Sequence, residues 1–193
     1  MNYRTHIVSS LSEIGKAAWD GLLALQEEAN PFLSYAFLHA LHESGCASPE
    51  TGWQPQYIAL YDGDTLAAAL PLYVKGHSYG EYVFDWAWAD AYQRHGLDYY
   101  PKLLSAVPFT PVAGPRLLAV DADARAALIA VLVATQRATE VSSTHILFPP
   151  EAHARQLQDA GFMLRSGVQF HWLNPGYANF DDFLATLEQK KRK

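Results

Sequence analysis

Cysteine is almost absent from the sequence, since Cys46 is the only one among 193 residues. A scaffold held by disulfide bonds is therefore excluded, and a reducing, cytoplasmic location is predicted. Charged residues are also scarce, at 18%, whereas aromatic residues reach 13% and apolar residues 50%. Because disordered chains have the opposite composition, we expect a folded domain with its own core.

Long apolar runs and strong positive charge are missing as well. The longest uncharged stretch with a helical period is bracketed by Arg125 and Arg137, which is well short of the ~20 residues of a membrane helix. The amino terminus lacks the apolar core of a signal peptide. The net charge of −6 argues against broad electrostatic attraction to DNA. We therefore predict no membrane insertion and no DNA partner, while the oligomeric state stays open.

Helical and alternating patterns follow one another along the chain. Helices are expected at 11–25, 34–44, 99–106, 121–137, 150–160 and from 181 onward, and strands at 5–9, 57–61, 66–74, 83–88, 144–148 and 162–173. Asp62-Gly63-Asp64 between two apolar runs indicates a hairpin. This order predicts an α/β (α+β) fold with helices on a mixed, mainly antiparallel sheet.

Gly76-His77-Ser78-Tyr79-Gly80 matches G-x-S-x-G, the nucleophile elbow of serine hydrolases. An apolar strand runs into this segment, as an elbow requires. The residues that follow, Glu81 to Trp86, are aromatic and β-rich rather than helical. A glycine-flanked loop is therefore the favoured interpretation, and a serine hydrolase that uses Ser78 is kept as an alternative.

The segment from Gln93 to Asp98 half-matches the pyrophosphate loop of acetyl-CoA-dependent N-acetyltransferases. Such a loop directs free backbone N–H groups at phosphate from a helix amino terminus. Gln93, Arg94 and Gly96 are the cofactor-binding candidates. Asp98 stands where a small residue is needed, and its carboxylate would repel phosphate, so an ordinary turn is the favoured interpretation.

His39 and His42 lie one helical turn apart, a spacing that zinc sites use. The H-E-x-x-H order of such sites is absent, and no third ligand can be nominated. No metal is predicted.

Polar and aromatic residues alternate through residues 76–116 more densely than elsewhere. Aromatic rings with polar tips are typical of ligand clefts, because they bury area and keep a hydrogen-bonding group. The alternative is an aromatic core whose hydroxyls bond the backbone. We expect a cleft, with these substrate-binding candidates: His77, Tyr79, Trp86, Trp88, Tyr92, Lys102 and Arg116.

The string from Lys75 to Tyr92, together with Tyr99–Leu103 and Val107–Val112, resembles the FemAB-like family of N-acyltransferases. That family is labelled peptidoglycan biosynthesis/recognition and is placed in the GNAT superfamily. Asn30-Pro31-Phe32-Leu33-Ser34 and Gly52-Trp53-Gln54-Pro55 also resemble its front half. The resemblance covers nearly the whole chain.

The resemblance implies a GNAT-like fold and transfer of an acyl or aminoacyl group to an amine of a small molecule or peptide. It implies acyl-CoA as the donor, with aminoacyl-tRNA as the alternative. Family members are longer and carry a second, similar half. We accordingly expect a GNAT-like domain at residues 1–178 and, at 179–193, the start of a helix that leads to a second half.

Amide formation of this kind needs a base for the ammonium proton, positioned reactants and donors for the oxyanion. Glu81 or Asp85 is the candidate base or amine-orienting carboxylate, and Tyr99 or Tyr100 the candidate proton donor to the leaving group. Lys102 and Arg116 are candidates for holding an anionic part of a ligand. A non-catalytic recognition or scaffold module is the alternative function.

Overall fold

Two four-stranded sheets form the centre of the computed structural model, which describes residues 3–83 and 85–191. The chain divides into two units, residues 1–163 and 164–193, and both sheets belong to the first. This mixed architecture confirms the predicted α+β class.

The first sheet is antiparallel throughout and has the strand order β1-β3-β4-β7. Its strands are β1 (Arg4–Val8), β3 (Tyr57–Asp62), β4 (Thr65–Leu70) and β7 (Leu118–Ala119). β3 and β4 form the hairpin that the Asp-Gly turn predicts, with Gly63 at a positive φ of 58°.

The second sheet has the order β2-β5-β6-β8, with one parallel pair, β6 and β8. Its strands are β2 (Trp53–Pro55), β5 (Tyr73–Lys75), β6 (Lys102–Ser105) and β8 (Thr144–Ile146). The single strand predicted at 66–74 is divided between the two sheets as β4 and β5. Pro71 lies at the division, where its missing N–H cannot continue a ladder.

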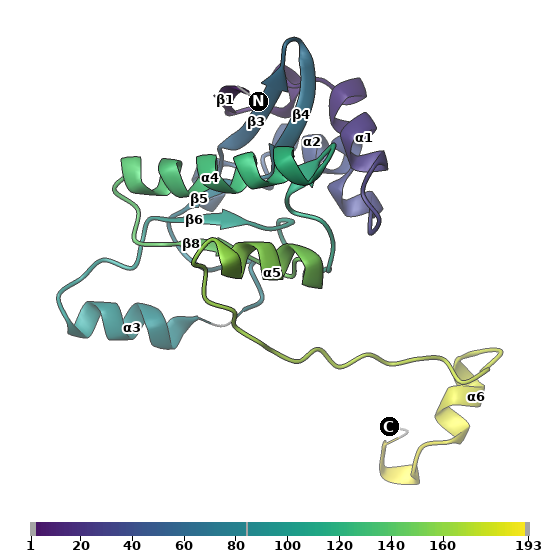
Figure 1. Ribbon diagram of the computed structural model, residues 1–193. Coiled ribbons are helices and arrows are strands. Elements are labelled where there is room, and N and C mark those ends of the chain that lie inside the picture. Colours follow the sequence, from purple (N-terminus) through teal and green to yellow (C-terminus); the bar gives the residue numbers. More distant parts are fainter. Residues whose placement is uncertain (1–2, 84, 192–193) are drawn as a thin grey trace. The chain divides into compact units, whose positions relative to one another are not determined.

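Helices cover both faces of the first sheet, and the strand β3 shows why (Figure 1). Tyr57 and Ala59 face one apolar cluster, which includes Trp19 and Leu38 from the helices α1 (Lys16–Ala24) and α2 (Tyr35–Glu43). The alternate residues of β3 face a second cluster with α4 (Ala122–Ala138) and α5 (Glu151–Asp159). A strand buried on both faces is therefore a nearly continuous apolar run.

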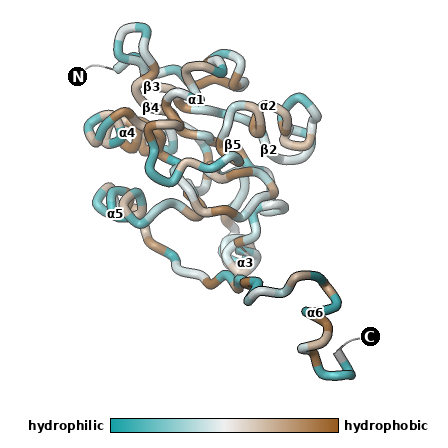
Figure 2. Tube along the Cα trace, turned by 90° about the vertical axis from the view of Figure 1, so that its right-hand side faces the viewer, coloured by the Kyte–Doolittle hydropathy of each residue, from teal (hydrophilic) through white to brown (hydrophobic). Residues whose placement is uncertain are grey.

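The predicted helix starts are largely those observed. The hydroxyl of Ser34 accepts a hydrogen bond from the Phe37 N–H at the start of α2, and Asp121 caps α4 in the same way. Figure 2 shows both hydrophobic and hydrophilic residues along α4, as expected for a helix with one buried face. Four short 3-10 turns also occur: η1 (Leu11–Glu13), η2 (Pro31–Leu33), η3 (Pro49–Thr51) and η4 (Gln189–Lys191).

Three predicted elements are wrong. The strand expected at 83–88 is replaced by the start of the helix α3 (Trp86–Arg94), in which alanines, strong helix formers, separate the aromatic residues. The helix expected at 99–106 is the strand β6, which is paired on both sides. No strand is present at 162–173, where the alternating pattern finds no partner strand among the described residues.

The second unit contains α6 (Phe180–Ala185), which begins after Asn179 as its N-cap. Trp172, Tyr177 and Phe183 form a small aromatic cluster within this unit, with ring centroids 5.7–6.4 Å apart. The predicted domain boundary at residue 178 stays a prediction.

The described residues contain neither a membrane-spanning helix nor a cluster of metal ligands. None of the helices there has the length and apolar character needed to cross a bilayer. No group of three or more potential metal ligands occurs within those same residues. His42 is instead hydrogen-bonded through Nε2 to the hydroxyls of Tyr57 and Tyr73.

Candidate functional site

The strands β5 and β6 place two lysines side by side, because Lys75 and Lys102 are partners in their ladder. Both side chains are fully buried. A buried ammonium group needs opposite charge or several hydrogen bonds to compensate for lost hydration. The residues between the two strands, 76–101, supply that compensation and form the site.

Lys102 is the centre of a hydrogen-bonded cluster. Its Nζ donates to Ser78 Oγ at 2.9 Å, to Glu81 Oε2 at 2.8 Å and to Asp85 Oδ2 at 2.5 Å. The three donors of an ammonium group are thereby all used. Glu81 and Asp85 are buried with it, so this is an ion-paired cluster shielded from solvent.

Two tyrosines complete what we call the Lys102 cluster: Ser78, Glu81, Asp85, Tyr99, Tyr100 and Lys102. The Tyr99 hydroxyl donates to Asp85 Oδ2 at 2.7 Å, and the Tyr100 hydroxyl lies 2.8 Å from Ser78 Oγ. One oxygen of each carboxylate, Oδ1 of Asp85 and Oε1 of Glu81, is buried without a hydrogen-bond partner. Unpartnered buried carboxylate oxygens are costly and mark a place where a ligand donor fits.

The environment drives the pKa values of the two carboxyl groups in opposite directions. Burial raises the pKa of Asp85, but hydrogen bonds from Lys102, Tyr99 and Ser78 outweigh it and lower the pKa to about 2. For Glu81, burial is the larger effect and raises the pKa, although Lys102 opposes it. Two neighbouring carboxyl groups separated in this way are suited to different roles, with Asp85 as a fixed anion and Glu81 as the better base.

Lys75 is buried against the indole ring of Trp53. Its Nζ is 3.7 Å from the ring centroid of Trp53 and donates to the Tyr79 carbonyl at 3.2 Å. Burial lowers its pKa to about 8, partly opposed by the charge of Glu81. Lys75 therefore anchors the turn that carries Ser78 and Tyr79.

Glycine is required at position 80 of this turn. Gly80 has a φ of 81°, and a Cβ there would lie 2.6 Å from the ring of Phe109. The Gly80 carbonyl accepts a hydrogen bond from the Phe109 N–H at 3.2 Å. The turn is thus held in one position against the loop that follows β6.

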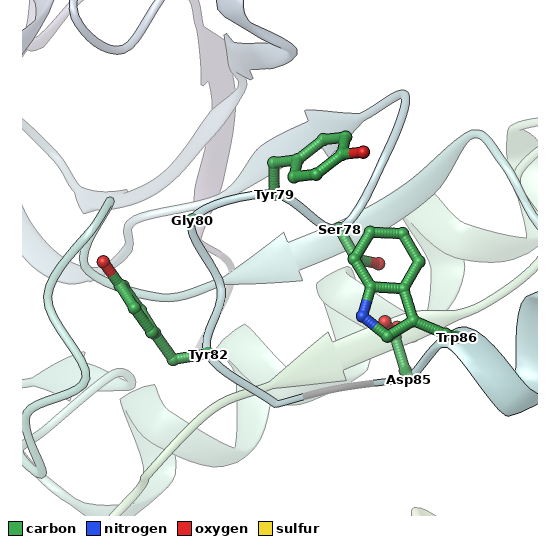
Figure 3. A pocket seen from close by; sticks show the side chains of 6 residues that line it. All are labelled: Ser78, Tyr79, Gly80, Tyr82, Asp85 and Trp86. Carbon is green, nitrogen blue, oxygen red and sulfur yellow. The ribbon is translucent and has the colours of Figure 1, made fainter.

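A cavity of about 150 Å³ opens at the turn, and its lining includes Ser78 and Asp85 from the Lys102 cluster. Tyr79 and Trp86 also line it and meet edge to face, with ring centroids 5.3 Å apart. Figure 3 shows Tyr82 on the other side of the turn from Ser78, Asp85 and Trp86. The cavity is therefore lined by one carboxylate, Asp85, and by three aromatic side chains, Tyr79, Tyr82 and Trp86.

A second cavity, of about 490 Å³, lies along α3. Trp86 lines both cavities, and Tyr99 and Tyr100 line the second one while their hydroxyls reach the Lys102 cluster. The other lining residues are Ala89, Asp90, Gln93, Leu97 and Asp98. Tyr92 contacts the ring of Tyr99 with centroids 5.2 Å apart.

The three cofactor-binding candidates lie at the carboxyl end of α3. Arg94 forms an exposed ion pair with Asp90, and the Gly96 N–H donates to the Gln93 carbonyl. Phosphate sites use free N–H groups at the amino end of a helix, where the dipole is positive. The position of these residues therefore gives no support to a phosphate loop, which stays a prediction.

Most catalytic and substrate-binding candidates belong to the Lys102 cluster or line one of the two cavities. Arg116, His77 and Trp88 do neither. Arg116 is fully buried and donates to the carbonyls of Val112 and Gly114, and it lines neither cavity. His77 packs on Gly52, where a Cβ would approach its ring to 2.3 Å. Trp88 is half exposed and lines neither cavity.

The sequence reasoning missed Lys75 and Tyr82. Lys75 ends an apolar strand and is paired with Lys102 across the ladder. Two paired buried lysines indicate a functional site, but the sequence does not reveal that they are paired. Tyr82 lines the first cavity with a positive φ of 62°, which no sequence pattern indicates.

The chain belongs to the FemAB-like family, described as peptidoglycan biosynthesis/recognition, whose family model matches residues 10–193. That match covers essentially the whole chain and confirms the resemblance carried by residues 75–112. No curated protein and no solved structure matches the chain significantly.

Proposed function

We propose that this FemAB-like chain binds a primary amine at Asp85 and takes part in transferring an acyl or aminoacyl group to it. The observation that carries the proposal is the unpartnered, buried Oδ1 of Asp85, in a residue that lines the first cavity. An alkylammonium group supplies both the charge and the donors that such an oxygen lacks. The aromatic side chains that line the first cavity accommodate the apolar stem of the amine.

The two carboxylates divide the work in this proposal. Asp85, whose pKa is lowered to about 2, stays ionised and orients the ammonium group. Glu81, whose pKa is raised by burial, accepts the proton that the amine must lose before it attacks a carbonyl carbon. Tyr99 orients Asp85 through its 2.7 Å hydrogen bond. Tyr100, whose hydroxyl lies 2.8 Å from Ser78 Oγ, is the proposed proton donor to the leaving group.

The donor is proposed to be acyl-CoA, with aminoacyl-tRNA as the alternative. We also propose that the chain is the GNAT-like, amino-terminal half of a longer cytoplasmic transferase, with a second, similar half that packs against it. These finer points rest on family membership and on the single cysteine.

Titration calorimetry with n-butylamine at pH 7 tests the amine site. We expect saturable binding to the natural protein and at least a ~10-fold loss of affinity, ~1.4 kcal/mol, in Asp85→Asn. Asp64→Asn is the matched control, because Asp64 is an exposed residue in the β3–β4 turn and lines neither cavity. Equal affinity in all three proteins would rule out Asp85 as the amine site.

A titration with acetyl-CoA tests the donor. Micromolar, saturable binding would support acyl-CoA and a donor site within this chain. Absence of binding would move the donor site to a second half or favour aminoacyl-tRNA. Amine binding without any acetyl-CoA binding would favour the recognition module over a self-sufficient enzyme.

A further inference from the structure

We propose that Ser78 is a nucleophile that carries the acyl group between donor and amine as an ester on its Oγ. This inference rests on the proposed acyl transfer and adds a covalent intermediate to it. Ser78 lines the first cavity and lies on the turn after β5. Its Oγ accepts a hydrogen bond from Lys102 Nζ at 2.9 Å and shares another with the Tyr100 hydroxyl at 2.8 Å.

The position of Ser78 separates it from an ordinary buried serine. Ser105 on β6 is also buried, but its Oγ has no hydrogen-bond partner and the residue lines neither cavity. Ser78 instead has a cation, Lys102, and a phenol, Tyr100, within 2.9 Å of its hydroxyl oxygen, and the hydroxyl also interacts with the carboxylate of Asp85. A nucleophilic serine requires such a setting, because its hydroxyl is a weak nucleophile until a neighbouring group takes its proton.

The proton path runs through Lys102. Lys102 Nζ gives a proton to Glu81 Oε2, 2.8 Å away, and takes the proton of the Ser78 hydroxyl, 2.9 Å away. The net result is an alkoxide on Ser78 and a protonated Glu81. Burial favours the neutral form of Glu81, so this carboxylate is the better acceptor of the two.

The first half-reaction forms an ester. The Ser78 Oγ bonds to the carbonyl carbon of a thioester or ester donor, the bond from that carbon to the leaving sulfur or oxygen breaks, and the leaving group takes the proton from Glu81. Tyr100 OH and Lys102 Nζ are the donors nearest to the oxyanion that forms in between.

The second half-reaction forms the amide. The ammonium group at Asp85 first loses a proton to Glu81. The free amine then bonds to the ester carbonyl carbon, the bond to Ser78 Oγ breaks, and the second amine proton goes to Ser78 Oγ. Serine is restored, Glu81 releases the proton it took from the ammonium group to solvent, and no oxidant or additional co-reactant is consumed.

p-Nitrophenyl acetate is the probe for the first step. We expect a burst of one equivalent of p-nitrophenolate per chain and, by intact-mass and peptide mass spectrometry, one acetyl group on the peptide that contains Ser78. Ser78→Ala should lose both signals, whereas Ser105→Ala should keep both. Ser78→Cys, which retains a nucleophile of similar size, should still be acetylated and guards against a variant that merely fails to fold.

Adding n-butylamine to the acetylated protein tests the second step. Release of the acetyl group as N-butylacetamide, faster than its loss to water, supports transfer from Ser78. Acetylation elsewhere, no acetylation, or loss of the acetyl group only as acetate would overturn the proposal, and the last result would identify a hydrolase instead. Amine binding at Asp85, measured separately by calorimetry, would stand in each of these cases, so the two proposals fail independently.

Discussion

Two buried polar clusters in the same domain differ in charge and in access. The Lys102 cluster holds an ammonium group and two carboxyl groups beside a cavity. The second cluster, formed by His42, Tyr57 and Tyr73, holds three neutral side chains, with the two hydroxyls 2.9 Å apart, and lines neither cavity. Burial lowers the pKa of His42 to about 4, which keeps it neutral at pH 7.

The comparison of the two clusters distinguishes polar groups that only pack from polar groups that are suited to bind a ligand. The neutral groups of the second cluster hydrogen-bond one another where α2 meets β3 and β5, although His42 Nδ1 is buried without a partner. Burying a neutral polar atom costs less than burying an ion. Ionised groups of the Lys102 cluster are expensive to bury, and replacing such groups by apolar ones is often neutral or stabilising. Retaining them next to a cavity, with one oxygen of each carboxylate unpartnered, is therefore better explained by ligand chemistry than by stability.

The largest expected effect comes from removing the central cation. Lys102→Met should lower the free energy of unfolding by about 3–5 kcal/mol, because two carboxylates then remain buried without their partner. Urea unfolding at pH 7 measures it, with Lys16→Met as the control at an exposed ion pair. A loss no greater than that of the control would mean that water reaches the cluster freely.

The pH dependence should separate the two clusters. His42 has its pKa lowered from 6.5 to about 4, so its contribution is present above pH 6.5 and is lost as pH falls toward 4. Because His42 is partly exposed, we expect only ~1–2 kcal/mol. Asp85 has its pKa lowered from 3.8 to about 2, so its contribution is lost only as pH falls from about 4 toward 2.

Urea unfolding between pH 7 and pH 3 checks this for the natural protein, His42→Gln and Asp85→Asn. The stability gap to His42→Gln should shrink between pH 6.5 and 4. The gap to Asp85→Asn should shrink below pH 4, where the contribution of Asp85 itself is lost, and any change above pH 4 reports Glu81, whose raised pKa depends in part on Asp85. Gaps that change together would contradict the assignment. His153, whose pKa burial also lowers to about 4, is present in all three proteins and cancels.

A smaller effect is expected from the neutral cluster at constant pH. Tyr73→Phe removes one hydroxyl that bonds both His42 and Tyr57, and should cost ~1 kcal/mol. It should leave n-butylamine affinity unchanged. Thermal or urea unfolding, paired with calorimetry, measures both quantities, and a loss of amine affinity would show that the two clusters are coupled.

The smallest effect should come from a charge on the surface. Arg94→Ala breaks the exposed pair with Asp90 on α3 and should change stability by no more than ~0.5 kcal/mol. It also tests the phosphate prediction, since acetyl-CoA affinity should be unaffected if residues 93–96 form an ordinary helix end. A clear loss of acetyl-CoA affinity would restore Arg94 as a cofactor ligand.

Local signals in the sequence predicted local structure well. The helices expected from residues 34 and 121 and the turn at Gly63 depend on neighbours a few residues away, and the structure contains all three. The elements at 83–88 and 99–106 were wrong because strand pairing and the alanines of α3 outweighed the aromatic pattern. Tertiary pairing of this kind has no short-range signature.

The candidate site was predicted in composition but not in arrangement. Glu81, Asp85, Tyr99 and Tyr100 were identified by residue type, and the structure joins them through Lys102. Lys102 itself was expected to hold a ligand anion, yet its three donors are used within the chain. Whether a lysine faces substrate or its own carboxylates depends on the β5–β6 pairing, which joins distant residues.

Because Lys75 and Lys102 are partners in the ladder, every residue of the site other than these two lysines belongs to one insertion in the second sheet. Residues 76–101 leave the second sheet after Lys75 and return to it at Lys102, the partner of Lys75. A short turn in their place would keep the strand register, provided that both lysines were exchanged for apolar residues. The sheet and the segment that carries the site are in that sense separable parts of the chain.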